Sequence, residues 1–187
     1  MLNRFYSSYP ILTTERLTLR QLAITDDQEI FKLCSDKAIN KYLNRETSNS
    51  IDDARIFIKR INENIDKHIA LYWAICLRDR NMMVGTICLY GFSEERSSCE
   101  IGFELLQDFQ RQAIMKEAAE KVIDYAFNTI QVQRIDAYLH KDNQSSIKLL
   151  EKLSFLNSNK IDEIHTNLIS YHLSNSNDLL DKPLEII

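Results

Sequence analysis

Glycine and proline are scarce in this chain of 187 residues, which contains three glycines and two prolines. The prolines, Pro10 and Pro183, lie near the two ends, so no proline marks an internal domain boundary. The sequence also lacks internal repeats and low-complexity linkers. These absences, together with a length typical of one domain, predict a single domain over residues 1–187. Its core is expected at about 10–174 and a tail at 175–187.

Basic residues are not in excess either, since the net charge is -4. This balance favours neither a nucleic acid nor an anionic membrane as partner. The N-terminal residues contain no long apolar run, so we expect neither a signal peptide nor a membrane-spanning segment. The four cysteines are Cys34, Cys76, Cys88 and Cys99, and no two of them form a CxxC pair. We therefore expect reduced cysteines in the core and no metal site. Reduced cysteines also favour a cytoplasmic location.

Strand patterns dominate the first half of the chain. Polar and apolar residues alternate over 16–20, which predicts a half-buried strand. Apolar runs at 71–77, 83–90 and 99–106 are separated by polar turns and predict an antiparallel meander. The Asn- and Ser-containing piece at 44–49 is interpreted as a loop.

Helical spacing of apolar residues appears before the meander and again after it. Helices are predicted near 25–34, from about Ile51 with Ser50 as its cap, over 116–127, and over 143–153 with Asn143 as its cap. Further strands are predicted at 134–139, near Phe155 and at 168–173. The order of elements indicates an α+β mixed sheet. The crossover through 116–127 should make the strands on either side of it parallel.

Four stretches, in order along the chain, resemble the GNAT N-acetyltransferases, and within them the branch of ribosomal-protein N-terminal acetyltransferases. The stretches are 14–20 (TERLTLR), 73–75 (WAI) with 84–87 (VGTI), 100–110 (EIGFELLQDFQ) and 143–155 (NQSSIKLLEKLSF). The resemblance implies the GNAT acyltransferase fold, a mixed and mostly antiparallel sheet flanked by helices. It also implies that the strands of Glu100 and Arg134 splay apart at a cofactor cleft.

The resemblance places acetyl-CoA, the co-substrate, at the turn before helix 116–127. Its pyrophosphate would lie against backbone amides at the start of that helix, where a helix attracts anions. The backbone of Leu105 would hold the pantetheine arm and polarise the thioester, and Asn143 would lie near the cofactor. The implied cofactor-binding residues are Leu105, Gln110, Arg111, Gln112, Ala113, Ile114, Met115 and Asn143.

This turn departs from the family pattern Gln/Arg-x-x-Gly-x-Gly/Ala. Ala113 stands where the family has glycine, and Met115 stands where a small residue is usual. A second departure lies outside the turn, where Ser154 replaces the glycine that usually precedes Phe155. Glycine serves such loops because it tolerates positive φ and lets backbone approach a ligand closely. We expect a negative φ at Ala113, with the loop repacked around its methyl group. Ala113→Gly should then change the acetyl-CoA dissociation constant by less than about threefold.

Acetyl transfer to an amine needs a base, a fixed donor at the carbonyl oxygen and a proton donor for the departing thiolate. By resemblance, Ser146 is the proton donor, since it matches a position where some members of this branch have a serine proposed for that role. Leu150 stands where many other GNAT enzymes use a tyrosine. The alternative role for Ser146 is that of a first-turn helix residue. Glu100 and Glu104 share one face of a strand, and Glu100 is the best candidate base. A water without a dedicated base is the competing hypothesis.

The expected function is direct transfer of acetyl from acetyl-CoA to a primary amine, with a protein N-terminus as the acceptor favoured by the resemblance. A small amine such as a polyamine or an antibiotic is the alternative within the same enzyme class. A degenerate GNAT domain that binds acyl-CoA without catalysis is the alternative from another class, and Ala113 and Leu150 are the residues that favour it. The sequence leaves open whether the protein is a monomer or a homodimer.

Overall fold

The computed structural model describes residues 8–43, 45–95, 97–161 and 167–175. The strands are β1 (Leu12–Thr13), β2 (Leu17–Gln21), β3 (Leu71–Leu77), β4 (Met82–Tyr90), β5 (Ser98–Leu105), β6 (Arg134–His140), β7 (Leu156–Ile161) and β8 (Leu168–Ser174). The helices are α1 (Asp27–Ser35), α2 (Lys37–Asn40), α3 (Ile51–Asp66), α4 (Ile114–Tyr125) and α5 (Gln144–Lys152). Short 3-10 turns occupy Ile24–Asp26 and Gln107–Phe109, and a π-helical turn at Ala126–Ile130 follows α4.

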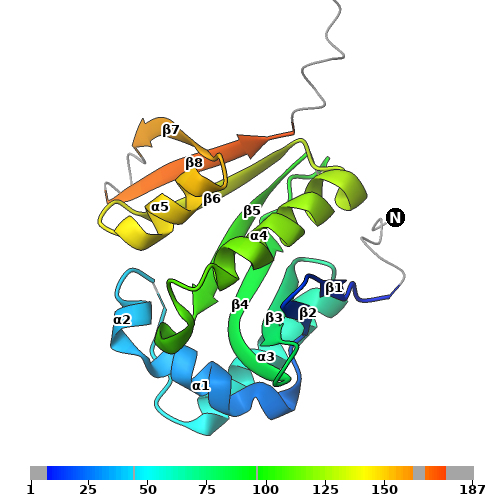
Figure 1. Ribbon diagram of the computed structural model, residues 1–187, viewed down its shortest axis with the longest axis vertical. Coiled ribbons are helices and arrows are strands. Elements are labelled where there is room, and N and C mark those ends of the chain that lie inside the picture. Colours follow the sequence, from blue (N-terminus) through cyan, green and yellow to red (C-terminus); the bar gives the residue numbers. More distant parts are fainter. Residues whose placement is uncertain (1–7, 44, 96, 162–166, 176–187) are drawn as a thin grey trace, which may run out of the picture.

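The strands within the described residues form one sheet in the order β1-β2-β3-β4-β5-β6-β8-β7 (Figure 1). Every neighbouring pair is antiparallel except β5 and β6, which run parallel on either side of the α4 crossover. The predicted mixed, mostly antiparallel α+β sheet is therefore confirmed, as is the parallel pair. The pairing of β5 with β6 covers only Ser98–Glu100 against Arg134–Asp136, although both strands continue beyond it. The two strands thus separate after Glu100.

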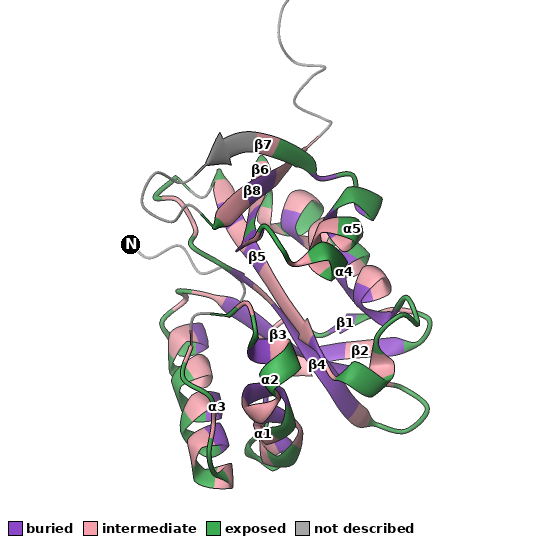
Figure 2. Ribbon diagram, turned by 90° about the vertical axis from the view of Figure 1, so that its left-hand side faces the viewer, coloured by how far each residue is buried: buried purple, intermediate pink, exposed green. Residues whose placement is uncertain are grey.

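Two hydrophobic clusters hold helices to opposite faces of this sheet. Leu71, Trp73 and Ile75 of β3 join the cluster that contains the apolar residues of α4 and α5. The alternate residues of β3 join a second cluster with the apolar stripes of α1 and α3. Since successive side chains of a strand point to opposite faces, β3 is buried on both sides. Figure 2 shows α1 and α3 together on one side of the sheet, with α4 and α5 on the other.

Helix starts follow their capping residues. The Ser50 hydroxyl accepts a hydrogen bond from the Asp53 amide at 3.2 Å, and the Asp53 carboxylate accepts one from the Ser50 amide at 3.0 Å. This reciprocal pair begins α3 as the sequence predicted. Asp36 caps α2 by accepting from the amides of Ala38 and Ile39. Helix α2 was not predicted from the sequence, and α4 begins two residues before its predicted start.

The cysteines are mainly core residues. Cys34, Cys76 and Cys99 are buried, whereas Cys88 is partly buried, and all four are free thiols. Among the helices in the described part of the chain, none is both long and apolar enough to cross a membrane. The tail expected at 175–187 lies almost entirely outside the described residues.

Candidate active site

A cleft of about 740 Å³ opens where β5 and β6 separate. One wall, called here the α2 wall, consists of Ala38, Ile39, Tyr42 and Leu43. Opposite it, the α4–α5 wall consists of Arg111 and Ala113 to Lys116 at the start of α4, and Asn143 to Ser146, Lys148, Leu149 and Lys152 of α5. The end of β5 and the following turn complete the lining with Phe103, Glu104, Leu105, Gln107 and Gln110.

Most of the residues that sequence reasoning singled out meet in this cleft. They are Leu105, Gln110, Arg111, Ala113, Ile114, Met115, Asn143 and Ser146. Gln112 and Glu100 do not line it. The Gln112 side chain turns back to donate to the Asp108 carbonyl at 2.7 Å, and the backbone carbonyl of Gln112 accepts from Arg16 Nη1 at 3.2 Å. Residues up to 41 positions apart in the sequence are thus brought together by the separation of two strands.

The start of α4 leaves backbone donors available to a ligand. Its N-cap is Ala113, which has no hydroxyl or carboxylate, and no side chain caps this helix in the described structure. The first amides of a helix have no intrahelical acceptor, and here they begin a helix at the edge of the cleft. Uncapped amides and the positive end of the helix dipole together favour an anionic ligand.

The negative φ expected at Ala113 is wrong. Ala113 has φ 59° and ψ 10°, which is the left-handed region. Ser154, the other residue that replaces a family glycine, has φ 66°. A non-glycine residue in this region carries a strain of about 1–2 kcal/mol. At Ala113 and Ser154 the chain therefore keeps the left-handed backbone that glycine adopts easily, although neither residue is glycine.

The first turn of α4 is fixed to the opposite edge of the sheet through Glu117. Its Oε1 accepts from the Thr14 hydroxyl at 2.5 Å, and its Oε2 accepts from Arg16 Nε at 2.6 Å. Partial burial opposes ionisation of Glu117, but the bonds from Thr14 and Arg16 outweigh it and hold its pKa below the ordinary value. This anchor keeps the start of α4 in place beside the cleft.

The backbone of Leu105 faces the gap between β5 and β6. Leu106 donates its amide to the Val84 carbonyl at 2.9 Å, and Leu105 lies opposite Gly85. Because hydrogen-bonding direction alternates along an antiparallel strand, the amide N–H and the carbonyl of Leu105 point away from β4. Its carbonyl accepts from Gln110 Nε2 at 3.0 Å, which leaves its amide directed into the cleft.

Positive charge gathers on the α4–α5 wall. Arg111, Lys116, Lys148 and Lys152 all line the cleft, while Glu104 is the acidic residue of the lining. Lys116 pairs with Glu120, and the other three make no ion pair with the described residues. Cations without acidic partners beside uncapped amides suit a polyanion such as a pyrophosphate.

Asn143 begins α5, as predicted, because its Oδ1 accepts from the Ser146 amide at 3.2 Å. The Ser145 hydroxyl donates to the same oxygen at 3.0 Å. The Ser146 hydroxyl has no protein partner among the described residues and lies in the cleft lining. Leu150, one turn later, is 1% exposed and belongs to the core. This turn of α5 therefore presents a hydroxyl to the cleft and a hydrocarbon to the core.

Glu100 and Glu104 share a face of β5 but have different surroundings. Glu100 lies at the last paired position before β5 and β6 separate, where it accepts a hydrogen bond from Tyr90. Burial, with a smaller contribution from the charge of Asp136, raises the pKa of Glu100 despite that hydrogen bond. Glu104 lines the cleft, but both of its oxygens accept from Arg45, at 2.8 and 2.6 Å.

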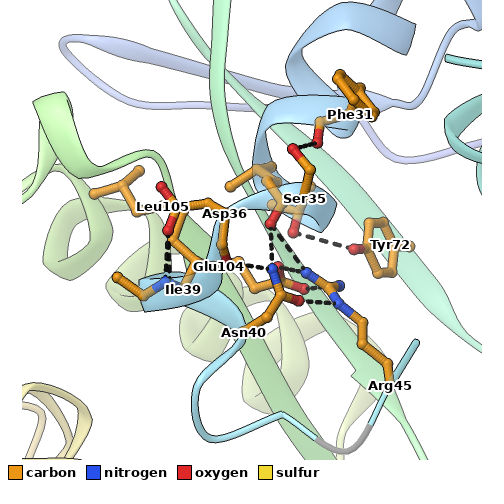
Figure 3. A network of polar contacts seen from close by, with 12 residues as sticks. Phe31, Ser35, Asp36, Ile39, Asn40, Arg45, Tyr72, Glu104 and Leu105 are labelled. Carbon is orange, nitrogen blue, oxygen red and sulfur yellow. Dashed lines mark hydrogen bonds and ion pairs between the residues drawn. The ribbon is translucent and has the colours of Figure 1, made fainter. Parts of the chain in front are cut away.

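Arg45 ties the α2 wall to β5 (Figure 3). Besides its two bonds to Glu104, it donates from Nε to Asn40 at 2.6 Å and from Nη2 to the Leu33 carbonyl at 3.3 Å. Burial lowers the pKa of Arg45, but the charge of Glu104 and the hydrogen bonds to it together outweigh burial, so the pKa of Arg45 is raised. The side chains of Arg45 and Glu104 are only 21% and 15% exposed, so removing one partner would leave the other poorly solvated. Such losses cost about 3–5 kcal/mol.

A weaker contact joins the α2 wall to β6. The rings of Tyr42 and His140 stack with centroids 5.1 Å apart and an interplanar angle of 26°. Aromatic pairs contribute about 0.5–1.5 kcal/mol beyond area burial. The α2 wall is therefore held strongly to β5 through Arg45 and weakly to β6 through Tyr42.

Three parts of the site were not predicted from the sequence, namely the α2 wall, Arg45 and the α5 lysines Lys148 and Lys152. One signal was available, because Asp36 at the end of α1 is a good helix cap. The ring contact and the ion pair join residues far apart in the sequence, so no local pattern indicates them.

The fold and cleft define an α+β enzyme built to bind an anion beside two separating strands. The acetyltransferase (GNAT) domain family matches residues 16–156, three quarters of the chain, and the protein belongs to this family. It is an acetyl-CoA-dependent acetyltransferase.

Curated relatives support this assignment. The chain is 31% identical to the uncharacterized N-acetyltransferase YoaA of Bacillus subtilis over 147 residues, which cover 79% of this chain and 83% of YoaA. It is 33% identical to the uncharacterized N-acetyltransferase p20 of Bacillus licheniformis over 144 residues, 77% and 81% of the two chains.

A solved structure of similar fold is RimL, a ribosomal L7/L12 α-N-protein acetyltransferase in complex with coenzyme A. Its TM-score is 0.77 at 18% identity, and the match covers 88% of this chain and 98% of RimL. At this identity the likeness shows a shared fold.

Proposed function

We propose that the protein transfers an acetyl group from acetyl-CoA to the free α-amine of a protein N-terminus. The observation that carries the proposal is the cleft between β5 and β6, which gathers eight of the ten predicted site residues. The α-N-protein acetyltransferase RimL, which shares the fold, supports the choice of a protein N-terminus.

The residues of the α4–α5 wall fit acetyl-CoA. The amides at the start of α4 would hold the pyrophosphate, with Arg111 and Lys116 adding charge. The Leu105 amide would hold the pantetheine arm in the gap between the strands, close to the thioester oxygen. Acetyl-CoA supplies the activated thioester, and these residues orient it and stabilise charge on its oxygen.

The proton transfers are assigned to Ser146 and Glu100. The amine nitrogen bonds to the thioester carbon as the carbon–sulfur bond breaks. Ser146, whose hydroxyl is free of protein partners in the described structure, gives a proton to the departing sulfur and regains one from solvent water. Glu100 takes the proton lost by the amine through a water, since it lies at the point of strand separation rather than in the lining. Its raised pKa makes it the better base, whereas Glu104 is occupied by Arg45.

The acceptor is tested by an amine panel with thiol release as the readout. Peptides with a free α-amine should give turnover, while the same peptides with a blocked N-terminus should give none. Faster turnover with spermidine or an aminoglycoside would replace the protein N-terminus with a small amine. A cytoplasmic location, and the choice between monomer and homodimer, stay predictions of the sequence.

Measuring acetyl-CoA binding together with thiol release distinguishes an active enzyme from a degenerate GNAT domain. Acetyl-CoA at 100 times its dissociation constant should stabilise the protein by about 2.7 kcal/mol, measured as a thermal shift. Stabilisation without thiol release for any amine would favour a binding domain without catalysis.

A further inference from the structure

We infer that the contact between Tyr42 and His140 is the gate through which the acceptor amine reaches the cleft. The inference rests on the proposed acetyl transfer and identifies the side from which the acceptor enters. Tyr42 follows α2, and His140 is the last residue of β6. Their stacked rings therefore join the α2 wall to the strand that has separated from β5.

The position of the gate follows from the sheet. The α4–α5 wall lies on one face of the separating strands and contains the cationic residues. The α2 wall crosses the opening, attached to β5 through Arg45 and Glu104 and to β6 through the ring contact. An acceptor that approaches acetyl-CoA from the side opposite its pyrophosphate must pass this wall.

The two attachments differ in strength, which decides where the wall opens. On the β5 side Arg45 donates two hydrogen bonds to Glu104, and Gln107 donates to Asp36, the α2 cap, at 2.6 Å. Arg45 is itself held to α2 and α1 by its bonds to Asn40 and to the Leu33 carbonyl. On the β6 side the contact that the described residues show is the stack of the two rings. His140 is itself held, because its Nδ1 accepts from the Asp142 amide at 3.2 Å. Tyr42 is thus the partner that moves, and the Arg45 end is the hinge.

The ring of Tyr42 suits the acceptor's chemistry. The ammonium of Lys41 lies over it, 4.9 Å from the ring centroid, so this aromatic surface already receives an alkylammonium. An acceptor amine is a cation before it loses its proton. The nearby carboxylate of Glu104 is taken by Arg45, so a cation at the α2 wall is received by ring faces instead of an ion pair. The ring surface at the gate therefore favours a protonated amine as the acceptor.

Tyr42→Ala, His140→Ala and Tyr42→Leu test the gate, with a tetrapeptide amide bearing a free α-amine as the acceptor. We expect each variant to raise the KM for the peptide about fivefold or more while the dissociation constant of acetyl-CoA changes less than twofold. Thiol release without any amine should rise at least threefold, because water enters a cleft that no longer closes. Tyr42→Phe keeps the stacked rings, so this matched control should behave like the wild type.

Proton NMR of the His140 imidazole gives a readout that does not depend on turnover. The ring current of Tyr42 should displace this signal, which His140→Ala identifies by its loss. The peptide should reverse the displacement when acetyl-CoA is present, and acetyl-CoA alone should not.

A tenfold loss of acetyl-CoA affinity in Tyr42→Ala would overturn the gate and place Tyr42 in the cofactor site. Unchanged KM and unchanged amine-free thiol release in the ring variants would also overturn it. Failure of the proposed function has a different signature, namely a wild-type protein that binds no acetyl-CoA. If acetyl-CoA binds but no amine reacts, amine-free thiol release and the NMR signal still decide the gate.

Discussion

The polar groups at the two walls of the cleft differ in whether they have hydrogen-bond or ion-pair partners within the protein. On the α4–α5 wall the first amides of α4 have no side-chain cap, and Lys148 and Lys152 have no acidic partner among the described residues. On the α2 wall Arg45 is saturated by Glu104, Asn40 and a backbone carbonyl. Buried polar groups that are satisfied internally stabilise a structure, whereas donors left unsatisfied at a cleft are available to a ligand. The comparison assigns anion binding to one wall and acceptor access to the other.

The largest expected difference between the walls is in stability. Arg45→Met should lower the free energy of unfolding by about 3 kcal/mol, because Glu104 is left without its partner in a poorly solvated place. Lys148→Met, on the other wall, should change it by less than about 0.5 kcal/mol. Urea denaturation measures both. Similar small losses in the two variants would show that the α2 wall is not held by Arg45.

Ser146→Ala should reduce turnover about tenfold or more, because proton donors typically contribute about 10²–10⁴-fold. The acetyl-CoA dissociation constant should stay within twofold, since the α5 cap is made by Asn143 and the Ser146 amide. Steady-state kinetics and calorimetry separate the two effects. Unchanged turnover would leave Ser146 with only its role at the start of the helix.

The pH dependence of turnover should identify Glu100. Its pKa is raised in the fold, so turnover should increase with pH as Glu100 loses its proton, above the usual range of a carboxyl group. Stability has the opposite pH dependence from turnover. As pH rises and Glu100 ionises, the free energy of unfolding falls, because the charged form is less favourable in the fold than in the unfolded chain. Glu100→Gln should therefore stabilise the protein above the raised pKa and have little effect at low pH. An acidic limb that persists in Glu100→Gln would favour a water without a dedicated base.

The smallest effects concern the two left-handed residues. Ala113→Gly and Ser154→Gly should each stabilise the fold by about 0.5–1 kcal/mol, since glycine removes the strain but adds freedom to the unfolded chain. Ser154 follows α5 and does not line the cleft, so it is the matched control. Because the strain is already present in the free protein, Ala113→Gly should change acetyl-CoA affinity by less than threefold. A tenfold tightening would favour the degenerate-domain alternative.

The sequence predicted what local patterns encode. Alternation and helical spacing predicted β2, the β3–β5 meander, α3 and α5, and the resemblance placed Ala113 and Ser146 at the cleft. The α2 wall could not be predicted in the same way, because α2 has four residues and no periodicity.

Tertiary contacts account for the remaining differences. Arg45 lies 59 residues from Glu104, so their ion pair exists only after the sheet has formed. The positive φ of Ala113 was also hidden, since the residue type favours negative values and the turn geometry overrides that preference.

Acetyl-CoA titration of the Lys148→Met/Lys152→Met double variant tests the assignment of the α4–α5 wall most directly. Calorimetry at low salt should show wild-type binding and a loss of about tenfold in the variant, with the loss shrinking as salt screens the charges. Lys59→Met/Lys67→Met, which removes two exposed lysines of the α3 region, should change the affinity by less than twofold. Absence of wild-type binding at millimolar acetyl-CoA, or equal losses in the two double variants, would contradict the assignment.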